Sequence, residues 1–173
     1  NNVWFTSDTH YSHTNLVSGV TRWRNADGEI PMNAVREFPD VDTMNELMVD
    51  NINKCVDAED WLIHLGDWSF GGIERVTEFR ERINCKNIVL MLGNHDHHIQ
   101  KEKQLQKLFT HVAHYEEMGI TRNQGKKKLV LCHYPIISWN GMREGTFMLH
   151  GHQHLKGDSR FCDRGNRRMD IGL

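Results

Sequence analysis

The chain opens with short apolar runs, separated by segments in which apolar and polar residues recur at helical spacing. The apolar runs at 3–5, 61–65 and 87–92 predict three buried strands. Three further strand-like runs follow one another without an intervening helix, over 112–120, 129–132 and 147–150. Alternation of strands and helices, followed by consecutive strands, predicts two sheets with helices outside them.

Two helices are expected between the first three strands, and a third is expected after them. The first helix has apolar residues at helical spacing, namely Met44, Leu47, Met48, Ile52 and Cys55. Thr43 and Glu46 form a candidate capping box at its start. The second and third helices are expected over 73–83 and 101–109.

Residues 19–41 fit neither pattern, and they contain the breakers Gly28, Pro31 and Pro39. So long a loop in a compact domain is often a lid or a binding loop, and we expect this Arg- and Trp-rich segment to shape substrate choice. Gly125 suits a turn between two strands. The lysines at 126–128 are expected to be a solvated surface of that turn rather than a clamp for phosphate.

Composition narrows the class of protein. The 173 residues suit one domain over 1–173, and no stretch approaches the ~18 apolar residues of a membrane-spanning helix. Formal net charge is −2, and no basic stripe predicts an extended nucleic-acid groove or a membrane surface. None of the four cysteines forms a C-x-x-C pair; they are Cys55, Cys85, Cys132 and Cys162. This spacing suggests reduced thiols. Because no signal peptide is visible either, we expect a cytoplasmic protein.

The 12 histidines are not scattered evenly, because five of them lie in polar clusters directly after predicted strands. The five polar clusters contain Asp8 and His10; Asp67; Asn94, His95 and Asp96; His133; and His152 and His154. Ligands of open α/β sheets bind outside the carboxyl ends of the strands, so clusters at five such ends predict one shared site. A glycine precedes three of them and lets the backbone come close to a bound group.

The donor atoms in these clusters indicate a metal site. Imidazole nitrogens, carboxylates and one amide oxygen, without sulfur, suit Mn, Fe, Zn, Co or Ni. Seven such groups are too many for one tetrahedral ion and fit two divalent ions that share a carboxylate. We expect Mn²⁺, with Fe, Zn, Co or Ni as the alternatives.

The charges of such a site favour an anionic substrate. Two divalent ions, two carboxylates and a bridging hydroxide leave one net positive charge, which a third carboxylate in place of Asn94 would cancel. Asn94 is therefore expected to be a neutral ligand. His95 is expected to stay off the metal as a proton donor, with Asp96 supporting its imidazolium form.

These residues resemble the calcineurin-like metallophosphoesterases, in particular the small bacterial and phage branch. The motifs are D-x-H at Asp8 and His10, G-D at Asp67, G-N-H-D at 93–96, H at His133, and G-H-x-H at 151–154. The resemblance implies a four-layer α-β-β-α sandwich of two mixed β-sheets flanked by helices. It also implies hydrolysis of phosphate esters by a metal-bridging hydroxide, with His95 as the general acid.

The resemblance also implies two sets of metal ligands that share Asp67. One set is Asp8, His10, Asp67 and His154, and the other is Asp67, Asn94, His133 and His152. His13 and Arg36 are candidate substrate contacts. His13 has loop packing as the equal alternative, and "REF" at 36–38 departs from the usual R-P-F of this branch.

A small phosphoester or nucleotide is the expected substrate, and a diester is favoured over a monoester. A non-catalytic metal-binding scaffold of the same fold is the alternative function. A metallo-β-lactamase type of site would need H-x-H-x-D-H, but positions 99 and 100 are Ile and Gln. His64 lies within a strand pattern and is expected to be a hydrogen-bonded core residue.

Overall fold

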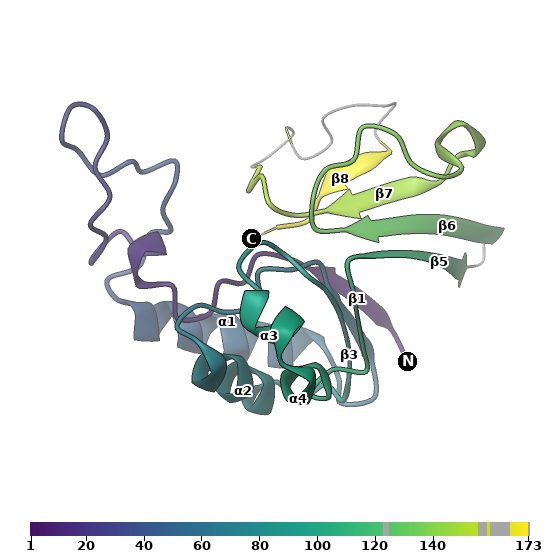
Figure 1. Cartoon of the computed structure of the whole chain (residues 1–173), viewed down its shortest axis with the longest axis horizontal. Coiled ribbons are helices and arrows are strands. Elements are labelled where there is room, and N and C mark those ends of the chain that lie inside the picture. Colours follow the sequence, from purple (N-terminus) through teal and green to yellow (C-terminus); the bar gives the residue numbers. More distant parts are fainter. Residues whose placement is uncertain (123–124, 156–158, 160–166, 173) are drawn as a thin grey trace.

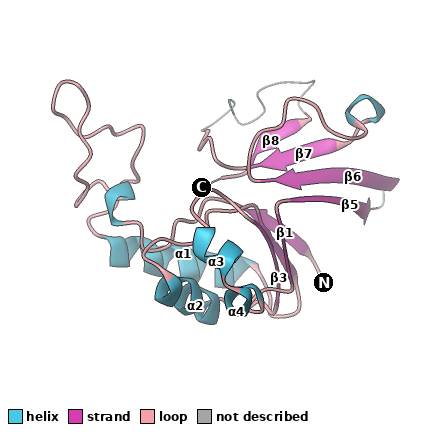
Figure 2. Cartoon of the chain, in the orientation of Figure 1, coloured by secondary structure: helices cyan, strands magenta, loops and turns pink. Residues whose placement is uncertain are grey.

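The computed structural model describes residues 1–122, 125–155, 159 and 167–172. They form two four-stranded sheets, with the α-helices packed on the outer side of the first sheet (Figures 1 and 2). The α/β class and the pair of sheets are confirmed. No helix among the described residues is both long enough and apolar enough to span a membrane.

The first sheet is parallel throughout, with strand order β1-β2-β3-β4. Its strands are β1 (Val3–Thr6), β2 (Trp61–His64), β3 (Asn87–Met91) and β4 (His111–Ala113). Parallel neighbours need crossover connections, and helices provide them. These helices are α1 (Val41–Cys55), α2 (Ile73–Arg82), α3 (His97–Lys101) and α4 (Lys103–Gln106).

The second sheet is mixed, with strand order β5-β6-β7-β8. Its strands are β5 (Tyr115–Arg122), β6 (Gly125–Cys132), β7 (Phe147–His150) and β8 (Arg168–Asp170). Only β5 and β6 pair antiparallel, so β6, β7 and β8 all run in one direction. Two short 3-10 turns complete the described elements, η1 (Thr14–Leu16) and η2 (Met142–Glu144).

Alternate residues of the central strands face two different cores. Leu62, Ile88 and Leu90 pack against the helices. Ile63, Val89 and Met91 instead face the second sheet, and they pack there with Leu129, Leu131 and Leu149. Because both faces of the first sheet are covered, its strands read as continuous apolar runs.

Two details of the layer prediction need correction. The first sheet is parallel rather than mixed. In the part of the chain that the structure describes, the outer face of the second sheet is covered by the loop that contains η2, not by an α-helix. Trp139 of this loop packs on Val130 and Met148 of the sheet. One large indole buries the same apolar strand positions that a helix would otherwise cover.

Three element predictions also need correction. The expected helix over 101–109 is two short helices interrupted at Glu102, whose backbone is extended (φ −101°, ψ 101°). The expected strand over 112–120 is divided at His114, where the chain leaves the first sheet and enters the second. The lysines at 126–128 are exposed as expected, but they lie within β6 rather than in a turn.

The capping box is wrong as well, because α1 begins earlier than Thr43. The Asp40 carboxylate is the N-cap and accepts a hydrogen bond of 2.7 Å from the Thr43 amide. This bond satisfies one of the amide groups that lack a partner in the first turn of the helix. It also lowers the pKa of Asp40.

The Asp40 cap gives a pH-dependent prediction. The pKa of Asp40 is lower in the folded than in the unfolded protein, so its ionised carboxylate stabilises the fold. This stabilisation is complete above the unfolded pKa of about 3.9, and it is lost as pH falls through the folded pKa. Asp40→Ala should therefore lower the free energy of unfolding at pH 7, and the loss should shrink at pH 3. Urea unfolding at both pH values measures this, with Asp50→Ala on the exposed face of α1 as the control. Equal losses for the two variants would contradict the cap.

Candidate metal centre

The structure brings the polar clusters of five strands to one edge of the two sheets. β1, β2 and β3 end there side by side, and β6 and β7 of the second sheet end at the same place (Figure 1). The seven side chains proposed as ligands follow these strand ends. They are Asp8, His10, Asp67, Asn94, His133, His152 and His154.

Four of these side chains form one group, in which Asp8, His10 and Asp67 follow strands of the first sheet and are buried, while His154 follows β7 and is partly exposed. His154 Nε2 lies 3.2 Å from His10 Nε2 and 3.3 Å from Asp8 Oδ1. His10 Nε2 lies 3.5 Å from Asp67 Oδ2. Ligands about 2.0–2.2 Å from a common ion lie about 3–3.5 Å from one another, so Asp8, His10 and His154 could hold one ion.

The second group is more open to solvent. His133 Nε2 lies 3.5 Å from Asp67 Oδ2 and 3.0 Å from Asn94 Oδ1. The same amide oxygen lies 2.9 Å from His152 Nδ1. Asp8 is also close enough to Asp67 and His133 to join this group, so both carboxylates stand between two sets of nitrogens. Because Asn94 and His152 are exposed, a substrate would approach from this side.

The protonation of His133 tests whether this group fits a cation. His133 Nδ1 lies 2.8 Å from the carbonyl oxygen of Leu65, which can only accept, so the neutral ring carries its proton on Nδ1. Its Nε2 and Asn94 Oδ1 are then two acceptors 3.0 Å apart, with no proton between them. A cation between the two atoms converts their repulsion into ligation, and so the residues present fit a metal ion.

Electrostatics keep the first group in metal-binding form. Burial, and after it the neighbouring His154, lower the pKa of His10 to about 2, so His10 is neutral at pH 7. Burial alone would raise the pKa of Asp8, but hydrogen bonds with His154 and Ser7 hold it well below its ordinary value. A neutral imidazole and an ionised carboxylate are the forms that bind metals.

Five of the seven proposed ligands also have an unusual backbone conformation. Left-handed φ values occur at Asp8 (56°), His10 (48°), Asp67 (56°), His152 (70°) and His154 (50°). This conformation is uncommon outside glycine, and clusters of such residues occur at functional sites where the surrounding structure holds them in place. Asp and His are among the residues that tolerate it best.

The glycines of the motifs make room for the ligands rather than for a bound group. A Cβ on Gly93 would lie 2.3 Å from Asp67 Oδ1, and one on Gly151 would lie 2.1 Å from Asp8 Oδ2. Gly66 has φ +100°, and a Cβ there would lie 2.6 Å from His133 Nδ1. Each glycine therefore lets one chain segment pass directly behind a proposed ligand.

The structure gives Asp96 a different role from the one expected. Its carboxylate is buried and accepts hydrogen bonds from the backbone amides of Gly93 (2.8 Å), Asp67 (2.8 Å) and Trp68 (2.9 Å). These bonds occupy both oxygens, so Asp96 joins the turns after β2 and β3 instead of supporting the His95 ring. Burial raises the pKa of Asp96 despite the three amide donors.

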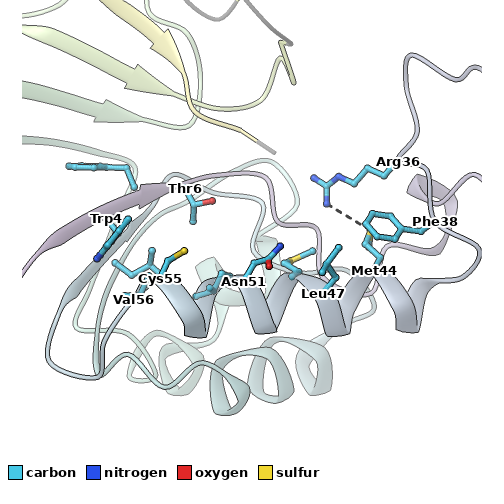
Figure 3. A pocket seen from close by; sticks show the side chains of 13 residues that line it. Trp4, Thr6, Arg36, Phe38, Met44, Leu47, Asn51, Cys55 and Val56 are labelled. Atoms are coloured by element: carbon cyan, nitrogen blue, oxygen red, sulfur yellow. Dashed lines mark hydrogen bonds between the residues drawn. The ribbon is translucent and has the colours of Figure 1, made fainter.

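Arg36 contacts the backbone of the loop after β1. Its guanidinium donates to the carbonyl oxygens of Asp8 (2.6 Å) and Thr9 (2.9 Å), and it lies 3.9 Å from Met44 Sδ. Figure 3 shows Arg36 at one end of a groove of about 470 Å³ between β1 and α1, lined mainly by apolar side chains. These bonds hold the loop that contains Asp8 and His10, and they suggest a positioning role for Arg36 beside the substrate contact proposed for it.

His64 is a hydrogen-bonded core residue, as predicted. It is fully buried, and its Nδ1 accepts from the Gly66 amide at 3.2 Å. Its Nε2 therefore donates to Thr9 Oγ1 at 2.9 Å. Thr9 Oγ1 in turn donates to the Trp68 carbonyl oxygen at 2.7 Å, and this chain of bonds holds the loops after β1 and β2 together.

A cleft of about 640 Å³ opens beside the two groups, and it is where His95 lies. The His95 backbone amide donates to Asp67 Oδ1 at 2.9 Å, which places its ring 5.4 Å from the His10 ring centroid. His13 also lines the cleft, but its ring stacks on Phe70 at 3.8 Å. The loop packing considered for His13 is therefore present, and its place in the cleft leaves the substrate contact a prediction.

Several cleft residues could not be assigned from sequence. Trp23, Phe70 and Gln153 line the cleft, and Tyr134 contacts the rings of His133 (4.9 Å) and His152 (5.0 Å). Of these, only Trp23 lies in the irregular segment 19–41, whose three arginines and one tryptophan indicated the segment without identifying the residue. Cys55, Cys85 and Cys132 are free thiols, and Cys162 lies outside the described residues.

Comparison with known proteins agrees with the fold and the motifs. The family described as calcineurin-like phosphoesterase matches residues 2–168. An uncharacterized protein of Methanocaldococcus jannaschii is 27% identical over 154 residues, which are 88% of this chain and 69% of that protein. The gene 66 protein of Mycobacterium phage D29 is 26% identical over 177 residues, covering 90% of this chain and 79% of that protein.

A solved structure has the same fold. The crystal structure of a protein of unknown function from Aquifex aeolicus superposes with a TM-score of 0.65 at 22% identity. The match covers 98% of this chain and 89% of that one, so it extends over both sheets.

The contacts of Arg36 generate a prediction. Lysine keeps the charge, but its single ammonium cannot replace a planar fork that spans two carbonyl oxygens. Arg36→Lys should therefore lower the free energy of unfolding by about 1–3 kcal/mol. It should also weaken Mn²⁺ binding about 10- to 100-fold, because the loop that contains Asp8 and His10 loses its support.

Urea unfolding and Mn²⁺ titration measure the two effects. Arg75→Lys is the matched control, since Arg75 is exposed on α2 and pairs only with Glu78 among the described ion pairs. A substrate contact would behave differently. It would lower kcat/KM while leaving Mn²⁺ affinity and stability unchanged, and that result would contradict the positioning role.

Proposed function

This chain belongs to the calcineurin-like phosphoesterase family, and from that premise we propose that it hydrolyses phosphate diesters with two divalent metal ions and with His95 as general acid. Family membership indicates a metal-dependent phosphoesterase. The proposal adds the number of ions, the type of ester and the roles of individual residues.

One observation supports the proposal most strongly. The donor atoms of seven side chains meet at one edge of the sheets in two groups, with Asp67 Oδ2 at 3.5 Å from a histidine of each group. A shared carboxylate suits a pair of ions. We assign Asp8, His10, Asp67 and His154 to one ion and Asp67, Asn94, His133 and His152 to the other.

Two divalent ions would supply positive charge for the phosphate and a hydroxide nucleophile at neutral pH. The protein's own residues would do the rest. The exposed Asn94 and His152 face the cleft, so the ester would bind on their side. His95, held beside the site by its amide bond to Asp67 Oδ1, would donate a proton to the leaving oxygen.

The cleft favours a diester over a monoester. Its described lining consists of histidines, amides, apolar groups and Asp67. A dinuclear site with the neutral ligand Asn94 would carry one net positive charge. That charge, with the imidazole and amide groups of the lining as hydrogen-bond donors, suits a phosphate with one negative charge. An ester group on each side of the phosphorus also fits a cleft of about 640 Å³ that is open to solvent.

The first test is metal stoichiometry. Protein reconstituted with Mn²⁺ should bind two ions per chain, measured by equilibrium dialysis and elemental analysis. Asp67→Asn should weaken both ions, because the bridging charge is lost while asparagine still tolerates a φ of 56°. Asp50→Asn, a surface carboxylate on α1, should keep two ions. A single ion in the unaltered protein would refute the dinuclear site.

The second test addresses His95. A general acid typically contributes about 10²–10⁴-fold to the rate, and it matters most when the leaving group is a basic alkoxide. His95→Ala should therefore lose far more kcat on an alkyl diester than on a nitrophenyl diester, with both ions retained. His97→Ala, its exposed neighbour, should change neither rate.

Three outcomes of these assays would revise the proposal. Equal losses on both esters with both ions retained would remove His95 from the acid role. Loss of an ion in His95→Ala would make His95 a ligand. Two bound ions without turnover of any ester would favour the non-catalytic metal-binding scaffold.

A further inference from the structure

An aromatic cluster forms one wall of the cleft beside the proposed metal centre. The His13 ring stacks parallel to Phe70, with centroids 3.8 Å apart and an interplanar angle of 3°. Trp23 meets His13 edge to face at 5.7 Å. His13 is in turn 5.5 Å from the His10 ring, so only one ring separates Trp23 from a proposed metal ligand.

Trp23 stands out within this cluster because its indole remains accessible. It is 36% exposed and lines the cleft together with the proposed ligands, so a bound molecule could reach it. It belongs to the segment that follows η1 and extends away from α1 (Figure 1). The metal centre itself has no need of an aromatic wall.

Hydrogen bonds fix the position of Trp23. Its backbone amide donates to Thr21 Oγ1 at 3.2 Å, and its carbonyl oxygen accepts from Arg24 at 2.6 Å. Thr21 is buried, and its hydroxyl donates to the carbonyl oxygen of Asn15 at 2.7 Å. The indole is thus presented from a backbone that is already ordered, which lowers the entropic cost of binding a ligand.

The other groups around the cleft indicate which ligand would use this wall. Besides the proposed ligand Asn94, three amide side chains line it, namely Asn15, Asn33 and Gln153. The side-chain oxygen of Asn15 (Oδ1) accepts from the Arg22 backbone amide at 3.1 Å, which leaves the side-chain NH₂ group of Asn15 as a donor. A flat π-face surrounded by amides is the combination that recognises unpaired nucleobases, by stacking and by hydrogen bonds to their edges.

We propose that Trp23 forms a stacking platform for a nucleobase, so that the substrates of this site are nucleotide diesters. The inference rests on the proposed function, since the phosphate must lie at the metal centre while the base reaches the indole across one ribose. Stacking on an aromatic side chain tolerates every base, because each has a π-face. We therefore expect a preference for nucleosides over other alcohols without strong selection among bases.

Two methyl diesters, one with a nucleobase and one without, test this proposal. They are adenosine 5′-(methyl phosphate) and ribose 5′-(methyl phosphate), each assayed with the Mn²⁺-loaded protein. The adenosine ester should have the higher kcat/KM by about 5- to 150-fold, the range of stacking one base on an aromatic side chain. Trp23→Ala should remove most of this ratio by slowing the adenosine ester alone, and Trp23→Phe should restore much of it.

Trp4→Ala is the matched control. Trp4 is 38% exposed, close to the value for Trp23, but it lies in the groove between β1 and α1 (Figure 3). It should leave the adenosine-to-ribose ratio unchanged. If Trp23→Ala lowers both esters equally, or if the unaltered protein does not distinguish them, the stacking platform is refuted.

A binding measurement separates this inference from the proposed function. Calorimetry compares the Kd values of adenosine 5′-phosphate and ribose 5-phosphate with the Mn²⁺-loaded protein and its Trp23→Ala variant. A preference for the adenosine compound that disappears in the variant supports the platform even if no ester is hydrolysed. Hydrolysis of both esters with equal Kd values would instead leave the proposed function intact and refute the platform.

Discussion

The position of Asp67 is the constraint on which the rest of the site depends. Its backbone amide donates to Asp96, and its carbonyl oxygen accepts from the His10 amide at 3.0 Å. Its carboxylate accepts from the His95 amide and lies 3.5 Å from the rings of His10 and His133. One left-handed residue after β2 thus connects the loops after β1 and β3 with the second sheet. A shift of Asp67 would displace both proposed ion sites together.

The pairing of the two sheets is what allows this convergence. The chain leaves the first sheet at His114, and the antiparallel pair of β5 and β6 reverses its direction. As a result, β6 and β7 end beside β1 and β2, and their histidines meet carboxylates more than 60 residues away in sequence. His133 is an example, because its Nε2 approaches Asp67 and its Nδ1 lies 2.8 Å from the backbone carbonyl oxygen of Leu65.

Sequence alone predicted the residues that meet, because ligand atoms at strand ends leave a local signal. Apolar runs ending at Asp8, Asp67 and Asn94 locate three loops at one edge of a parallel sheet, and the donor types indicate a metal. The roles of Asp96 and Arg36 could not be read in this way. Both act on backbone groups of distant segments, and no periodicity reports which carbonyl or amide a side chain reaches. The break at His114 was hidden for a related reason, since strand propensity continues across a change of sheet.

The bridge between Val17 and Arg36 has a consequence for how this protein could diversify. Backbone hydrogen bonds close the base of the segment between them, from Arg36 to Leu16, from Ser18 to Arg36 and from Gly19 to Phe38. None of these bonds depends on a side chain of residues 20–34. Lengthening a closed loop is inexpensive, at about 0.6 kcal/mol for each doubling. Residues 20–34 can therefore change in length and sequence while the backbone bonds at 16–19 and 36–38 that close the segment stay in place, so new cleft walls can evolve without disturbing the proposed ligands.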